Sequence, residues 1–203
     1  MSRKAISANM SFVCHQCGKV HDGLSFAYSA EAPADYYSIS ESLRDYSAVL
    51  LSEQCIIGEE GFFVRGCLEV PIVGSSDVFS WGVWVLLSQQ DFERMAEMSG
   101  IAGRESEPAY AGLLGTELPF YPDTLSLKAK VHTRPVGQRP FVELEPTDHP
   151  LAVEQRTGIS METARRIAEM LEHQVPPNNL SDPEPEPDEL KAKKLPWWRF
   201  FWS

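Results

Sequence analysis

The 203-residue sequence lacks the positive charge and the long apolar runs that mark two large classes of proteins. Its 18 lysines and arginines are outnumbered by 29 aspartates and glutamates, which gives a formal net charge of −11. Because phosphate binding needs a basic surface, this balance argues against a nucleic-acid partner. No run reaches the roughly 18 apolar residues that a membrane-spanning helix needs. The longest candidate, residues 78–87, is expected to be a buried strand instead.

Short catalytic signatures are missing as well. The sequence contains no Gly-rich phosphate loop, no G-x-S-x-G turn and no H-E-x-x-H helix,. The first twelve residues carry no apolar run, so we expect neither a signal peptide nor secretion, and we predict a cytoplasmic protein. In that compartment the four cysteines are expected to be thiols or metal ligands rather than disulfides.

Composition divides the chain into three parts. Residues 1–11 are polar and are expected to form a disordered N-terminus. Residues 12–175 are long enough to bury a core and are expected to form a single domain. Residues 176–203 begin as a spacer rich in proline and acids, which cannot pack a core, and end in lysines and aromatic residues,.

Periodicity predicts an α+β fold, with an antiparallel sheet and flanking helices. The segment 32–54 is expected to be helical, with Ser40 as its N-cap and Leu43, Tyr46, Val49 and Leu50 facing a core,. The remaining expected elements are a hairpin over 54–71, a strand over 78–87, a helix over 88–100, strands within 124–135 and 138–146, and two helices within 149–174. Asp148 and Pro150 are expected to begin the first of those two helices.

The most informative stretch is SFVCHQCGKVHDG, residues 11–23. Cys14 and Cys17 are two residues apart, a spacing that lets both thiolates point at one ion. Gly18 allows the backbone to bend back, and His21 follows closely enough to bind the same ion. The stretch therefore predicts a small N-terminal zinc-knuckle-like loop that holds a structural Zn²⁺.

The remaining ligand must come from elsewhere in the chain. Cys55, at the start of a strand, is preferred over Cys67, because a thiol inside a strand usually serves as a small apolar side chain,. His149 stays open as a remote ligand. Two other interpretations of the cysteine pair are free thiols and a redox couple. The redox couple would need a helix after the motif, and the residues that follow are poor helix formers.

A thiolate-rich ion is a weak Lewis acid, which favours a structural role over catalysis. The alternative is a zinc-dependent hydrolase with an open metal position, in which Asp22 or Glu53 would act as the base. The acidic and imidazole groups at residues 148–154 are explained by helix capping rather than by acid–base chemistry.

The C-terminal stretch KAKKLPWWRFFWS combines lysines with a run of aromatic side chains. Exposed apolar clusters favour association, so this stretch is expected to dock to another protein or to the domain itself. The candidate partner-binding residues are Trp197, Trp198, Arg199, Phe200, Phe201 and Trp202. A peripheral membrane tether is the alternative, although the acidic spacer and the short length weaken it.

Two motifs, F-x-C-x-x-C-G-x-x-H at residues 12–21 and D-H-P-L-A-x-E-Q at 148–155, occur with intervening blocks such as WGVWVLLS and LPFYPDTLSLKAKVH. Over residues 12–170 the sequence resembles a bacterial family of uncharacterised domains. The resemblance implies no activity; it implies that Cys14, Cys17, His21 and Cys55 occupy motif positions, whereas position 67 is more often apolar. Taken together, we expect a non-enzymatic, zinc-stabilised interaction or regulatory domain, for example one that acts as an immunity protein does.

Overall fold

The structure is a computed structural model that describes residues 11–14 and 17–173, with the backbone alone at residues 11, 12, 21 and 22. The expected disordered N-terminus, apart from residue 11, and the expected C-terminal tail lie outside these residues. The strands are β1 Ser11–Val13, β2 Val20–Asp22, β3 Ala27–Ser29, β4 Ala48–Leu50, β5 Gln54–Ile57, β6 Gly61–Pro71, β7 Val78–Leu87, β8 Tyr110–Leu114, β9 Lys128–His132 and β10 Phe141–Leu144. The α-helices are α1 Ala34–Ser38, α2 Glu41–Ser47, α3 Gln89–Met98, α4 Pro150–Thr157 and α5 Met161–Glu172.

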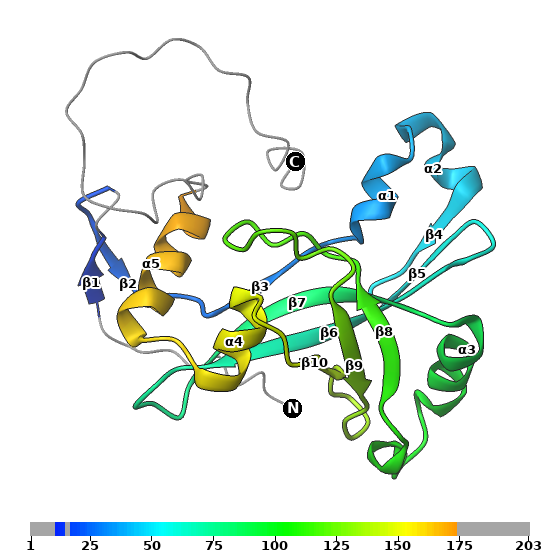
Figure 1. Cartoon of the computed structure of the whole chain (residues 1–203). Coiled ribbons are helices and arrows are strands. Elements are labelled where there is room, and N and C mark those ends of the chain that lie inside the picture. The colour runs from blue at the N-terminus through cyan, green and yellow to red at the C-terminus, as the bar shows by residue number, and fades with distance from the viewer. Residues whose placement is uncertain (1–10, 15–16, 174–203) are drawn as a thin grey trace.

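Strands β3 to β10 form one mixed sheet in the order β3-β7-β8-β9-β10-β6-β5-β4 (Figure 1). Strand β6 also pairs with β7, which closes β6, β7, β8, β9 and β10 into a five-stranded barrel. Most pairings are antiparallel, and β3–β7 and β6–β10 are parallel. The predicted α+β class is confirmed. The closure of the sheet was not foreseen, because it depends on β10 returning to β6 from far along the chain.

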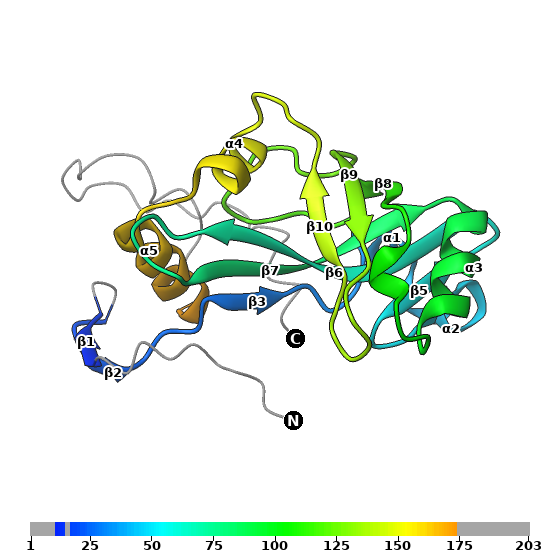
Figure 2. The same ribbon diagram turned by 90° about the horizontal axis from the view of Figure 1, so that it is seen from below.

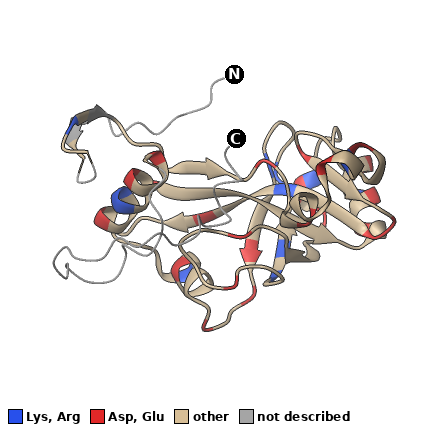
Figure 3. Ribbon diagram, turned by 90° about the horizontal axis from the view of Figure 1, so that it is seen from above, with Lys and Arg blue, Asp and Glu red and all other residues tan. Residues whose placement is uncertain are grey.

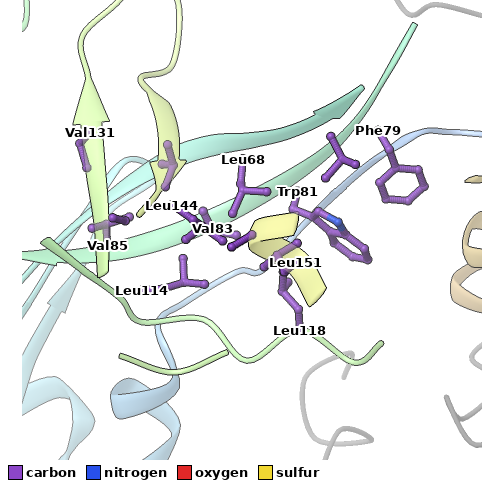
Figure 4. Close-up of a cluster of buried hydrophobic side chains, with 14 of the residues drawn as sticks. Leu68, Phe79, Trp81, Val83, Val85, Leu114, Leu118, Val131, Leu144 and Leu151 are labelled. Carbon is purple, nitrogen blue, oxygen red and sulfur yellow. The ribbon is translucent and has the colours of Figure 1, made fainter. Parts of the chain in front are cut away.

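The main core fills the barrel and the space under α4, as Figure 4 shows. Alternation along β6 and β7 points their inward side chains at this core, and Gly66 lies where a side chain has no room. A Cβ atom at Gly66 would stand 2.6 Å from Cγ2 of Val142, so the glycine lets β6 and β10 approach each other. Trp81 belongs to the main core and Trp84 to a second cluster, so these two side chains face opposite sides of the strand.

Serine caps begin two of the helices. The Ser88 hydroxyl accepts the Asp91 amide proton at 3.1 Å, and the Ser160 hydroxyl accepts that of Thr163 at 3.0 Å,. The predicted cap of α4 was wrong by one residue. His149, not Asp148, is the N-cap, because its Nδ1 accepts the Leu151 amide proton at 3.2 Å.

The prediction of one helical segment over 32–54 with a buried stripe was wrong. The segment forms α1 and α2 and then extends into β4, whose residues pair with β5. Pairing with β5 satisfies backbone groups that the helix would otherwise have satisfied, and this tertiary contact overrides local propensity. The expected core side chains Leu43, Tyr46, Val49 and Leu50 are all exposed.

Seen from two directions, the molecule has two distinct ends (Figures 1 and 2). The β1–β2 hairpin and α5 lie at one end, and α2, β4 and β5 lie at the other. Acidic and basic residues are interspersed along the ribbon between them (Figure 3). Among the described residues, no helix has both the length and the apolar character required to cross a bilayer.

Candidate metal centre

The cysteine motif forms the tip of the β1–β2 hairpin. Its strands are antiparallel, with Val13 opposite Val20. The Cys14 amide donates to the Lys19 carbonyl, and the Gly18 amide donates to the Cys14 carbonyl, both at 2.9 Å. Gly18 has a φ of +65°, a left-handed conformation that glycine adopts without steric cost,. The turn therefore holds Cys14 and Cys17 on the same tip.

Little apolar burial supports this hairpin. Each strand has three residues, and the facing pair Val13 and Val20 is 62% and 66% exposed. An isolated two-stranded hairpin is marginally stable at best in water. Cys14 is nevertheless only 1% exposed, so the cysteine end of the hairpin packs against other parts of the molecule.

The residue that meets the cysteines is His173, at the C-terminal end of α5. Sγ of Cys14 and Nε2 of His173 are 3.1 Å apart. The two cysteine sulfurs and a ring nitrogen of His173 all lie within 4.8 Å of one another. In a tetrahedral zinc site, ligand atoms at about 2.0–2.3 Å from the ion stand roughly 3.5–3.8 Å from each other. The three side chains are thus gathered where a metal ion could bind, with the Cys14–His173 pair somewhat closer than in a loaded site.

Helix α5 places His173 firmly. The His173 amide donates to the Glu169 carbonyl at 3.1 Å, and Ala164, Ile167 and Ala168 are buried beneath the helix. The Tyr28 hydroxyl donates to the Ala168 carbonyl at 3.2 Å, which ties the helix to β3. Burial, and then the charge of Glu172, raise the pKa of the Tyr28 hydroxyl, so it remains a donor. The carbonyl end of a helix also carries a partial negative charge, which favours a cation there.

Cys55 is not part of this group. It is fully buried on β5 against Phe63 and Trp84, at the opposite end of the molecule from the hairpin (Figure 1). Burial raises the pKa of the Cys55 thiol to about 11, which keeps it protonated at neutral pH,. A cysteine binds a metal ion as the thiolate, and a buried thiol that stays protonated is a poor ligand. The environment of Cys55 is therefore that of an apolar core residue.

The other candidate residues are placed as follows. Cys67 lies on β6, half buried. Both ring nitrogens of His149 are engaged, because Nδ1 accepts the Leu151 amide proton and Nε2 lies 2.5 Å from the Pro122 carbonyl. The carboxylate of Glu53 binds Arg139 through two contacts, at 2.7 and 2.8 Å.

His21 and Asp22 lie on β2, and their side chains are outside the described part of the structure. The backbone of His21 stands opposite Phe12, two residues before Cys14. Its role as a ligand stays a prediction. Asp22 follows it at the end of the strand.

The sequence reasoning missed His173. It is one of five histidines in the chain and follows the last predicted helix directly. No local spacing connects a residue 159 positions away to Cys14. The only signal was an imidazole at the end of an amphipathic helix, next to the proline-rich spacer.

Two thiolates and one imidazole suit a soft or borderline ion such as zinc. The redox interpretation needs the first cysteine at the N-terminus of a helix, whereas here the cysteine pair is followed by a turn and strand β2,. The group is therefore best described as a candidate metal centre with three ligands among the described residues: Cys14, Cys17 and His173.

Comparison with known proteins assigns no activity to this centre. A family described as "Uncharacterized protein conserved in bacteria (DUF2199)" matches residues 13–159. No curated protein and no solved structure matches the chain. The matched range contains Cys14 and Cys17, and His173 lies beyond its end.

Proposed function

The chain belongs to this uncharacterised bacterial family, and we propose that it is a non-enzymatic, cytoplasmic domain that a structural zinc ion stabilises and that binds another protein. The observation that carries the proposal is the convergence of Cys14, Cys17 and His173 within 4.8 Å. These three residues would hold the ion. When bound, the ion would join the N-terminal hairpin to the last helix of the domain.

The need for such a link follows from the energetics of the hairpin. Its exposed valines contribute little hydrophobic stabilisation, and closing a short loop costs conformational entropy,. A structural zinc site contributes on the order of 10 kcal/mol, enough to order a segment of this size. A thiol–imidazole hydrogen bond would also explain the 3.1 Å contact, but it contributes only about 1 kcal/mol,.

A structural role is favoured over hydrolysis by the ligand set and by the surroundings. Two thiolates donate charge to the ion and weaken it as a Lewis acid. Glu53, one of the two candidate bases, is bound to Arg139 and lies between β4 and β5, which are at the end of the molecule away from the hairpin (Figure 1). A fourth protein ligand would complete a closed site, and His21 remains the predicted residue for that position.

The metal content of purified protein tests the centre. We expect one zinc per chain by elemental analysis, and we expect Cys14→Ser, Cys17→Ser and His173→Asn each to lower that content. Cys67→Ser is the matched control, because its thiol lies on β6, outside the group. Replacement of zinc by Co²⁺ would report the ligands directly, since thiolate–cobalt charge transfer absorbs in the near ultraviolet.

The variants also separate the possible ligand sets. If His21→Ala lowers zinc content as strongly as His173→Asn does, the site has four protein ligands and is closed. Retention of full zinc content by both Cys14→Ser and His173→Asn would disprove the proposed centre. Substrate turnover that Cys14→Ser abolishes in a folded protein would instead show a catalytic ion.

The protein-binding half of the proposal rests on the absence of a catalytic motif and on the aromatic C-terminal stretch. Affinity capture with the full chain, compared with a chain in which the aromatic residues of 197–202 are serine, tests it. A specific partner retained by the first and lost by the second is the expected result. Capture of the same proteins by both would place partner binding elsewhere.

A further inference from the structure

Exposed apolar side chains are concentrated on the α2–β4 arm. Among the described residues, five of the twelve exposed large apolar side chains fall between positions 43 and 51, and Tyr46 is 88% exposed. We call these five the α2–β4 strip; they are Leu43, Tyr46, Val49, Leu50 and Leu51. The other seven are spread along the rest of the chain. A concentration of this kind marks an interaction surface rather than chance exposure.

The strip includes the open edge of the sheet. Strand β4 is last in the strand order and pairs with β5 alone among the described strands. The Leu51 amide donates to the Gln54 carbonyl, so the backbone of Leu51 and of Val49 faces β5,. The amide and carbonyl of Leu50 therefore point away from β5. An apolar edge strand with outward backbone groups is a template for another strand.

Acidic side chains border the strip. Glu41 and Asp45 lie on α2, and Glu59 and Glu60 form the β5–β6 turn, all exposed. The Gly58 amide donates to the Ser47 carbonyl at 2.8 Å, which fixes that turn beside the junction of α2 and β4. The one basic residue of α2, Arg44, donates to the Ile39 carbonyl and lies over the rings of Tyr36 and Tyr37. The border of the strip is therefore acidic, and its complement is a basic segment with apolar side chains.

The chain itself carries such a segment beyond the described residues. Residues 191–203 contain three lysines, one arginine and no acid, and residues 197–202 are aromatic except for Arg199. Aromatic residues favour extended strands, and Pro196 precedes the run without interrupting it. From His173 to Trp197 an extended chain spans about 80 Å, whereas a domain of this size has a radius of gyration of about 15 Å. The segment is long enough to reach the far end of its own molecule.

We propose that residues 197–202 add to the open edge of β4 as a further strand within the same molecule. Their aromatic side chains would cover the α2–β4 strip, and the lysines at 191–194 would lie against the acidic border. The inference is independent of the metal centre, which lies at the other end of the molecule (Figures 1 and 2). A partner that uses the aromatic segment would have to displace it from β4, so partner binding would expose the strip.

Hydrogen exchange measured by mass spectrometry on the full chain tests this docking. In the wild type we expect the amides of residues 48–51 to exchange at least about tenfold more slowly than in a variant whose five aromatic residues in 197–202 are serine. The amides of 197–202 should be protected in the wild type as well. Val49→Lys puts a charge that must stay solvated into the strip that the aromatic side chains would cover, and should release that protection.

Val136→Lys is the matched control, because Val136 is exposed to a similar degree, 51% against 57% for Val49, and lies outside the strip. Protection of 197–202 should survive in this control. Equal exchange at residues 48–51 in the wild type and the serine variant would overturn the proposal. So would protection that increases with protein concentration, which would indicate pairing between copies, or protection of 197–202 that requires anionic lipid vesicles.

Discussion

At one end of the molecule a hairpin with almost no buried apolar surface presents two of the three candidate metal ligands, and at the other the α2–β4 arm presents five exposed apolar side chains. Both are short elements that extend from the same barrel. The hairpin carries the thiols of Cys14 and Cys17, which a metal ion can bind. The arm is paired to β5 through the backbone of β4. The second hydrophobic cluster, Cys55, Phe63 and Trp84, is fully buried.

The comparison shows that elements outside the barrel depend on different kinds of support. A hairpin of three-residue strands cannot supply the hydrophobic free energy that ordering requires, so a strong local interaction must replace it. The arm is anchored by the β4–β5 ladder. The exposed apolar side chains of the arm are the surface that we propose the C-terminal aromatic segment covers.

Removal of metal should produce the largest difference in amide exchange between the two ends. With a chelator, or in Cys14→Ala, we expect amide exchange in β1 and β2 to accelerate by more than about a hundredfold, because the proposed ion would supply most of the hairpin's stability. Exchange in β5 should remain unchanged. Hydrogen exchange with mass spectrometry measures both segments in one sample. Equal acceleration at the two ends would mean that the centre stabilises the whole domain.

A large-to-small substitution in the second hydrophobic cluster should lower the stability of the domain and leave the metal centre unchanged. Phe63→Ala removes a side chain that is 1% exposed and should lower the free energy of unfolding by about 3–5 kcal/mol,. Tyr46→Ala, on the exposed strip, should change it by less than about 0.5 kcal/mol in the chain with the serine tail. Urea unfolding curves give both values. The zinc content of Phe63→Ala should stay at the wild-type level under native conditions.

The pH dependence of stability should distinguish the buried thiol from a ligand. Burial raises the pKa of Cys55 from 9.0 to about 11, so the folded state retains the proton more strongly than the unfolded state. The contribution, on the order of 2 kcal/mol, is fully present below pH 9 and is lost as the pH rises from 9 to 11. Cys55→Val should remove this part of the decline. Parallel curves for variant and wild type between pH 8 and pH 11 would contradict it.

The smallest effect is expected at the surface ion pair of the arm. Glu53→Gln breaks the contacts to Arg139, and both side chains are more than one-third exposed, so we expect a loss below about 1 kcal/mol,. Thermal unfolding at low and high salt measures it. Zinc content should not change, because Glu53 lies away from the hairpin. A marked drop in bound zinc would instead support the alternative in which the Glu53 carboxylate acts at the metal.

Much of the fold could be predicted from local pattern. The β5–β6 hairpin, β7, the capped helices α3 and α5, and the α+β class all follow from periodicity, turns and caps that act over a few residues,. The segment 32–54 could not be predicted, since its apolar spacing fits a helix equally well and only the pairing with β5 makes its last part a strand.

The sequence by itself determined the tip of the metal centre, because Cys14, Cys17 and Gly18 are brought together by a turn that needs no distant partner. Only the tertiary structure decided what meets that tip. The packing of α5 on the main core and against β3 places His173 beside the hairpin, and the pairing of β5 with β6 buries Cys55 against Phe63 and Trp84 at the other end. Whether a thiol becomes a ligand or a core residue depends on which distant strands surround it, and such long-range contacts leave no signal in spacing alone.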